Sequence, residues 1–372
     1  MKEIPELRVI EILKENRIDI AATLPCDRIK ALLPLIEKNL KTIPLTREEN
    51  GVGICAGIYL GGERPIMVIQ STGIGNMINA LESLNITYGI PLPVLASWRG
   101  VHKEAIEAQW QFGKKLPAIL DAAGIEVTLV EVKDEMDRIN LAIKDSFDNH
   151  RPHIVLISPA VWEESSFENT VPCEITPRLS HIDFRSEIRK PEMTRYEAIR
   201  TLVTFAGDDI IISNLGIPSK ELHEIKDREL NFYMTGSMGL VSSIGLGLAL
   251  TQERHVYVID GDGSILMNPN ALASIGAYNP GNLTIVAIDN AACGSTGNQK
   301  TCTNDQIDLE LLAKANGISD TKKAHSCEEL KAALLRRVAF IHAIVKPVNA
   351  TCREIPFSAT EIRDRFMKAL GK

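Results

Sequence analysis

The chain lacks the features that mark several classes of protein. Its seven cysteines are scattered over 372 residues without a CxxC pair, which argues against a zinc ribbon or a thioredoxin-type site and favours reduced thiols. No run of about 18 uncharged apolar residues occurs, and the N-terminal residues are charged throughout, so we expect neither a membrane span nor a secretory signal. A net charge of −7 argues against a nucleic-acid or anionic membrane surface. A cytoplasmic protein is the expectation.

Short apolar segments alternate with longer segments of helical period along both halves of the chain. This alternation is typical of parallel sheets covered by helices, so we predict an α/β fold with two doubly wound parallel-sheet domains. The domains are expected at 1–165 and 194–372, with a linker at 166–193 that contains three prolines. The predicted strands are Asp19–Leu24, Thr42–Leu45, Pro65–Gln70, Pro93–Ser97, Glu126–Val130, His153–Ile157, Asp209–Ser213, Asn231–Met234, His255–Ile259, Leu283–Ile288 and Phe340–Val345.

Polar residues follow two apolar strands in the second half. One strand leads into GDGS (261–264), and after a helix the next strand ends in DN (289–290). Because parallel strands end at the same edge of a sheet, Asp262 and Asn290 could face one ion. A carboxylate and an amide oxygen suit Mg²⁺, and glycines allow close approach to a diphosphate. For GDG alone, a simple turn after a strand would be the better interpretation.

These motifs resemble the signature of the thiamine diphosphate-dependent decarboxylases, in which GDG is followed, one helix later, by an Asn pair. Here Asp289 replaces the first Asn and the second is kept. The resemblance implies that Asp262, Asn290 and the carbonyl of Ala292 hold Mg²⁺. It also implies that the diphosphate lies beside Gly261, Gly263 and Ser264.

The segment GSMG (236–239) looks like the family's binding segment for the aminopyrimidine ring. By this resemblance, the Gly236 carbonyl accepts a hydrogen bond from the amino group of the cofactor. Met238 would lie beneath the cofactor and bend it. Taken alone, the segment would be a glycine-rich turn with a core methionine.

The first half contains TREENG (46–51) before an apolar helix, GVGICAGIYLGG. In the family a Glu precedes an A-G-Y-like segment and donates to the pyrimidine ring, and the register set by Ala56 and Gly57 matches Glu48. A carboxyl group in a dry pocket can hold a proton for a ring nitrogen. The alternatives are that Glu49 has this role, or that both are exposed first-turn residues favoured by the helix dipole.

The resemblance also implies a substrate class. Most relatives have an extra middle domain that this chain is too short to contain, and the compact plan is shared by enzymes that decarboxylate sulfonated or phosphonated pyruvate. The sequences of segments 25–27 (PCD) and 97–100 (SWRG) look most like those of the enzymes that act on the sulfonate. The implied reaction converts 3-sulfopyruvate to sulfoacetaldehyde and CO₂, a step of coenzyme M synthesis. Phosphonopyruvate or another short 2-oxo acid is the alternative.

Candidate residues for the distal anion lie after a predicted strand. Arg99 is the first choice because its guanidinium matches a tetrahedral oxyanion, and His102 and Gln109 come second. Asp27 could relay protons or cap the following helix. The loop QSTGIGN (70–76) could donate backbone N–H groups to a substrate, or be a plain connection.

The sequence disfavours two other functions. A dinucleotide-dependent dehydrogenase is disfavoured because no strand leads into GxGxxG. A non-enzymatic subunit completed by a partner is disfavoured because Glu48 and the metal motif occur in one chain. The resemblance assigns 1–165 to pyrimidine binding and 194–372 to diphosphate and Mg²⁺ binding. It also implies a homo-oligomer, at least a dimer, in which two chains share each active site.

Overall fold

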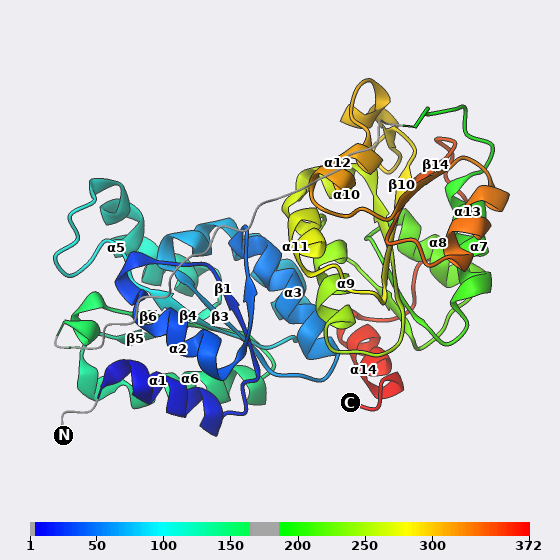
Figure 1. The fold of residues 1–372 in the computed structure, drawn as a ribbon. Coiled ribbons are helices and arrows are strands. Elements are labelled where there is room, and N and C mark those ends of the chain that lie inside the picture. Colours follow the sequence, from blue (N-terminus) through cyan, green and yellow to red (C-terminus); the bar gives the residue numbers. More distant parts are fainter. Residues whose placement is uncertain (1–3, 164, 166–185) are drawn as a thin grey trace. The chain divides into compact units, whose positions relative to one another are not determined.

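The computed structural model describes residues 4–163, 165 and 186–372, which belong to two compact units, Met1–Pro177 and Arg178–Lys372 (Figure 1). The boundary between the units falls within the predicted linker, of which 166–185 lie outside the described residues. The described end of that segment contacts the second unit, where Ser186 Oγ donates to Glu310 Oε2 at 2.9 Å. None of the described helices is long and apolar enough to cross a membrane.

The first unit contains a six-stranded, fully parallel sheet in the order β2-β1-β3-β4-β6-β5. The doubly wound order places the carboxyl ends of β1, β3, β4 and β6 side by side at one edge. The strands are β1 (Ile20–Thr23), β2 (Lys41–Pro44), β3 (Pro65–Gln70), β4 (Leu92–Ser97), β5 (Glu126–Val130) and β6 (Pro152–Ile157). The helices are α1 (Pro5–Glu15), α2 (Leu32–Asn39), α3 (Glu48–Leu60), α4 (Ile78–Ala80), α5 (Glu107–Ala122) and α6 (Asp137–Asp148), with shorter turns η1 (Asp27–Ile29), η2 (Ser71–Asn76), η3 (Leu81–Ile86), η4 (Lys133–Glu135) and η5 (Pro159–Trp162).

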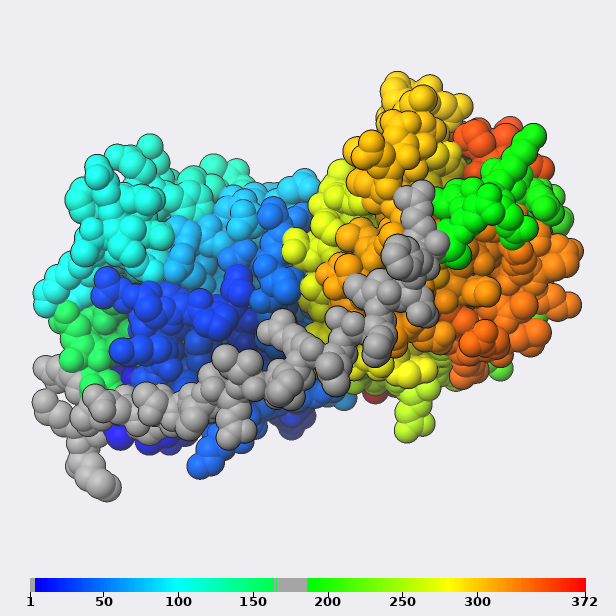
Figure 2. Space-filling view, turned by 45° about the horizontal axis from the view of Figure 1, so that its top comes forward, coloured from blue at the N-terminus to red at the C-terminus, as the bar shows by residue number. Residues whose placement is uncertain are grey.

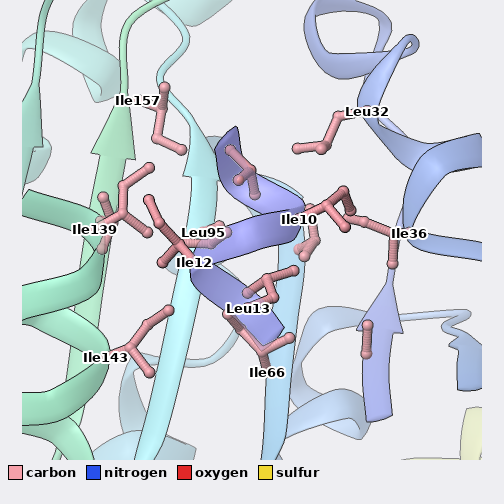
Figure 3. Packing of buried hydrophobic residues seen from close by; sticks show 14 of the residues in the cluster. Ile10, Ile12, Leu13, Leu32, Ile36, Ile66, Leu95, Ile139, Ile143 and Ile157 are labelled. Carbon is pink, nitrogen blue, oxygen red and sulfur yellow. The ribbon is translucent and has the colours of Figure 1, made fainter. Parts of the chain in front are cut away.

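Apolar side chains from α1 and α6 pack against one face of this sheet (Figure 3). Ile12 and Ile139 are fully buried. The side chain of Leu95, from β4 of the sheet, is buried beside them. Burial of each such side chain contributes about 1.5–3 kcal/mol. This packing fixes the strands whose carboxyl ends carry the candidate site.

The second unit repeats the plan, with a six-stranded parallel sheet in the order β13-β14-β10-β9-β7-β8. Its strands are β7 (Ile210–Ser213), β8 (Asn231–Tyr233), β9 (Val256–Gly261), β10 (Leu283–Asp289), β13 (Thr321–Ala324) and β14 (Phe340–Ile344). Its helices are α7 (Arg195–Ala206), α8 (Ile217–Ile225), α9 (Val241–Ala249), α10 (Asp262–Met267), α11 (Asn270–Tyr278), α12 (Leu309–Ala315), α13 (Cys327–Leu335) and α14 (Ala359–Ala369), with the turn η6 (Cys302–Asn304). A short antiparallel ribbon of β11 (Ala292–Cys293) and β12 (Gln299–Lys300) protrudes from this unit, in amber in Figure 2. The predicted fold class is confirmed.

Candidate active site

The metal-binding residues predicted in the second unit lie together at the ends of two adjacent strands. Asp262 is the first residue of α10, directly after β9, and Asn290 directly follows β10. Both side chains are buried. They line a cavity of about 420 Å³ together with Ala292.

The residues predicted beside the cofactor line the same cavity. These are Met238, Gly261, Gly263 and Ser264. Gly236 lies in the loop after β8, two residues before Met238, and is not among the residues that line it.

The two glycine-rich turns of this cavity are joined by hydrogen bonds. Gly239 N donates to Ser264 Oγ at 3.1 Å, and Asn268 Nδ2 donates to the Gly239 carbonyl at 3.1 Å. Gly239 has a φ of +92°, a left-handed conformation that favours glycine. Met238 leaves 39% of its surface exposed although it is apolar. A cavity lined by the apolar Met238 and by the polar Asp262, Ser264 and Asn290 fits a cofactor with an aromatic part and a diphosphate.

Two threonines that were not predicted surround the Asp262 carboxylate. Thr301 donates to Asp262 Oδ2, and the Thr303 hydroxyl lies 3.1 Å from the same oxygen. Burial raises the pKa of Asp262, and the nearby charge of Asp289 adds to this effect. A bound cation would offset both the effect of burial and the repulsion by Asp289, and would lower the pKa of Asp262.

No cluster of three or more His, Cys, Asp or Glu side chains suited to a metal occurs among the described residues. A metal at Asp262 would therefore depend on the Asn290 amide, the Ala292 carbonyl and oxygens of the ligand. Such a set of oxygen donors suits Mg²⁺ rather than a softer ion.

Asp289, the residue that departs from the family's Asn, contacts a buried histidine. His342 Nε2 lies 2.8 Å from Asp289 Oδ2, and His342 Nδ1 lies 3.5 Å from Asp308 Oδ1. Burial alone would lower the pKa of His342, but the two carboxylates raise it above its ordinary value. The sequence offered no signal for this contact, because it joins residues on neighbouring strands far apart in the chain.

Glu48 is the first residue of α3 and is buried in the first unit. Asn76 Nδ2 donates to Glu48 Oε2 at 3.0 Å. A Cβ atom at Gly73 would lie 2.0 Å from Glu48 Oε1, so only glycine leaves room for this carboxyl group. Glu49 instead pairs with Arg47 at 3.2 Å and is more exposed. The interpretation of Glu48 as an exposed first-turn residue is therefore wrong.

Arg99 lies in a network of hydrogen bonds at the same edge of the sheet. Its Nε and Nη2 donate to the two carboxylate oxygens of Glu104 at 2.6 and 3.1 Å. Its Nη1 donates to Asp27 Oδ1 and Gln70 Oε1, both at 2.9 Å. The hydrogen bond from Arg99 lowers the pKa of Glu104 to about 2. Glu104 was not predicted, although it stands only five residues after Arg99.

Asp27 does not cap the helical turn that follows it. Cys26 occupies the N-cap position and makes no side-chain capping bond, so the capping interpretation is wrong. The Asp27 carboxylate is 65% exposed and pairs with Arg99. Unlike Glu104, it remains accessible to a ligand.

A second cavity, of about 510 Å³, lies within the first unit. Asp27, Arg28 and His102 are among the residues that line it. His102 Nε2 lies 2.7 Å from Glu163 Oε1. Arg28 was not predicted, and its buried Nε has no hydrogen-bond partner among the described residues.

Gln109 lies in the first turn of α5 and is not among the residues that line this second cavity. A Cβ atom at Gly100 would lie 2.2 Å from the Gln109 carbonyl oxygen. The start of α5 therefore packs closely on the loop after β4, which carries Arg99.

Comparisons with known proteins agree with this geometry. The model of the thiamine pyrophosphate enzyme N-terminal TPP binding domain matches residues 7–124, and that of the C-terminal TPP binding domain matches residues 220–343. Fold and site thus define a thiamine pyrophosphate enzyme.

Two relatives of this chain are decarboxylases of substituted pyruvates. A sulfopyruvate decarboxylase from Methanosarcina acetivorans is 54% identical over 98% of this chain and 97% of that protein. A phosphonopyruvate decarboxylase from Streptomyces viridochromogenes is 31% identical over 89% of this chain and 85% of its own length. The chain belongs to the thiamine diphosphate-dependent decarboxylase family.

A solved benzoylformate decarboxylase from Polynucleobacter necessarius has the same fold. The TM-score is 0.73 over 94% of this chain and 99% of that chain, at 12% sequence identity.

The family assignment excludes a dinucleotide-dependent dehydrogenase. Because both domains occur in one chain, it also removes the main reason to expect a subunit completed by a different partner.

Proposed function

We propose that this enzyme decarboxylates 3-sulfopyruvate to sulfoacetaldehyde and CO₂ with thiamine diphosphate and Mg²⁺, as a step of coenzyme M synthesis. The observation that carries the proposal is the 54% identity to a sulfopyruvate decarboxylase over nearly the whole chain. The buried Glu48 and the paired strand ends at Asp262 and Asn290 supply the groups that the reaction requires.

In the second unit, Asp262, Asn290 and the Ala292 carbonyl hold Mg²⁺ in this proposal. Gly261, Gly263 and Ser264 line the cavity and bind the diphosphate, with their backbone N–H groups as donors. The Gly236 carbonyl and Met238 bind the pyrimidine end. When bound, thiamine diphosphate supplies a nucleophilic carbon and an acceptor for the electrons released as CO₂ leaves.

In the first unit, Glu48 holds a proton for the pyrimidine nitrogen. Asn76 fixes one carboxyl oxygen, and the missing Cβ at Gly73 makes room for the other. Burial keeps water away from this carboxyl group, so its proton transfers within the site.

The sulfonate binds to Arg99 in this proposal, with His102 and Gln109 as further candidates. Glu104 holds two sides of the guanidinium, so the anion would take the place of the exposed Asp27 carboxylate at Nη1. Asp27, once released, would be free to carry a proton. Exchange of one anion for another leaves the buried Arg99 charge compensated throughout.

The substrate is tested with purified protein, thiamine diphosphate and Mg²⁺. We expect CO₂ release from 3-sulfopyruvate with a kcat/KM well above that for phosphonopyruvate or pyruvate. The phosphonopyruvate decarboxylase relative makes phosphonopyruvate the second candidate. A clear preference for it would overturn the substrate assignment and leave the cofactor chemistry intact.

A further inference from the structure

Asp289 is held by three hydrogen-bonding groups at the end of β10. His342 Nε2 lies 2.8 Å from Oδ2, while Thr303 Oγ1 and Ala291 N lie 2.8 and 3.0 Å from Oδ1. His342 is fully buried on β14, the neighbouring strand. A carboxylate thus stands at the end of β10, opposite a buried imidazole.

The Thr303 hydroxyl lies between Asp289 and Asp262, at 2.8 Å from one carboxylate and 3.1 Å from the other. A hydroxyl has one proton, so it can donate to only one of these carboxylates at a time. Asp289 shares this proton with Asp262, whereas its contacts with His342 and the Ala291 N–H are not shared with that carboxylate.

The backbone turn that Asp289 holds carries two of the proposed metal ligands. Ala291 has a φ of +53°, a left-handed conformation that is strained for alanine. Its N–H donates to Asp289, and Asn290 Oδ1 accepts from Ala292 N at 3.2 Å. A displaced Asp289 would release this turn and move both Asn290 and Ala292.

The other side of His342 faces a second carboxylate. His342 Nδ1 lies 3.5 Å from Asp308 Oδ1, too far for a strong hydrogen bond, while Asp308 Oδ2 pairs with Lys323 Nζ at 2.9 Å. All three side chains are buried. Asp289, at 2.8 Å from Nε2, is therefore the closer of the two carboxylates that flank the imidazole.

We propose that His342 is a positioning residue for the cofactor's metal site, acting through Asp289. The inference rests on the proposed function, because it requires thiamine diphosphate and Mg²⁺ to bind at Asp262 and Asn290. The proposed metal site would then include a supporting residue from β14, a strand that carries none of the predicted ligands.

The test measures thiamine diphosphate affinity by calorimetry at saturating Mg²⁺, and Mg²⁺ affinity at saturating thiamine diphosphate. We expect His342→Gln and Asp289→Asn each to weaken binding about tenfold, as loss of a partner that orients a metal ligand does. The double variant should recover most of the affinity, because two amides can hydrogen-bond to each other and leave no unpaired charge.

His255→Gln is the matched control. His255 is also buried in the second unit and hydrogen-bonds Thr284 Oγ1 at 2.8 Å, but it stands at the amino end of β9. It should lower the Tm and leave cofactor affinity unchanged.

Two results would overturn the inference: His342→Gln that lowers only the Tm, as the control does, or a double variant that binds more weakly than both single variants. If His342→Gln does not fold, the comparison of Asp289→Asn with the double variant still decides. A wild-type protein that binds no thiamine diphosphate would instead overturn the proposed function.

Discussion

At the scale of single residues, the proposed ligands are each contacted by side chains from other segments of the chain, such as Thr303 beside Asp262 and Glu104 beside Arg99. Asp262 and Asn290 became candidates because each follows an apolar strand, and Glu48 because its register to Ala56 and Gly57 resembles that of the family. Glu104 was missed because no short motif records its pair with Arg99, five residues earlier. Thr303 and His342 were missed because their contacts with Asp289 join different segments of the chain. Buried polar networks of this kind become visible only once the strands are placed side by side.

The two adjacent glutamates of α3 allow a matched comparison. Glu48→Gln should lower kcat by about 10²–10⁴-fold, because the amide cannot hold the proton that the buried carboxyl holds. Glu49→Gln should change kcat little, since Glu49 only pairs with Arg47. Steady-state kinetics with circular dichroism as a check on folding measure both. The opposite ranking would transfer the role to Glu49.

Arg99 is tested by a ratio of substrates, because its removal also leaves Glu104 buried without its cation. In Arg99→Ala, kcat/KM for 3-sulfopyruvate should fall about 10- to 100-fold further than that for pyruvate, the loss expected for charge-assisted hydrogen bonds to the sulfonate. Any loss of folded protein cancels in this ratio. Lys103→Ala, at an exposed cation of the same loop, should leave the ratio unchanged. Equal losses on both substrates would show that Arg99 does not bind the sulfonate.

At the scale of helices and strands, apolar segments were predicted well and polar ones were not. The predicted bounds of β3 and β5 agree with the structure, whereas β13 was missed because TKKA (321–324) contains two lysines. Its Lys323 is buried through ion pairs with Asp308 and Glu310, at 2.9 and 2.6 Å. Residues 76–87 have an amphipathic pattern that predicts one helix, but they comprise the last residue of η2, then α4 and the π-helical turn η3. At β13, tertiary ion pairs therefore overrode the local pattern.

The buried charge of β13 makes a prediction about stability. Lys323→Met should lower the free energy of unfolding by about 3–5 kcal/mol, because it leaves two carboxylates buried without their cation. Lys322→Met, at the exposed neighbouring position, should have little effect. Denaturant unfolding monitored by circular dichroism compares the two variants, and an equal loss in both would show that the ion pairs contribute nothing.

The same ion pairs predict the dependence of this effect on pH. Burial would raise the pKa of Glu310, but the hydrogen bond from Lys323 lowers it to about 2. A group whose pKa is depressed by folding stabilises the protein above its unfolded value, near 4.5, and loses that effect as the pH falls towards 2. The difference between wild type and Lys323→Met should therefore shrink over this range.

At the scale of the whole molecule, the chain divides its chemistry between two units. Glu48 belongs to the first unit and Asp262 to the second, and each unit has its own sheet and core. The alternation of apolar and helical segments was enough to predict this plan. Which copies of the two units meet is a property of the assembly, which the sequence of one chain does not encode locally. We propose that two chains share each site.

Mixing two inactive variants tests the shared site. When Glu48→Gln and Asp262→Ala proteins exchange subunits at equal amounts, half of the dimers are hybrids, and one of the two sites in each hybrid has neither lesion. Activity should then recover to about a quarter of the wild-type value. Mass spectrometry of differently labelled chains verifies the exchange. No recovery despite exchange would place each site within one chain.

The separation of the two sheets bears on how such a gene can change over time. Every described strand of either six-stranded sheet pairs with strands from its own half of the chain, so no ladder of backbone hydrogen bonds joins the halves. A gene fission that separated the two coding halves would therefore leave both sheets whole, and each product could fold before it met the other. A gene fusion would likewise join two coding regions without disrupting either sheet. The covalent link fixes the stoichiometry of the halves at one to one, which two separately translated polypeptides would have to achieve by matched expression.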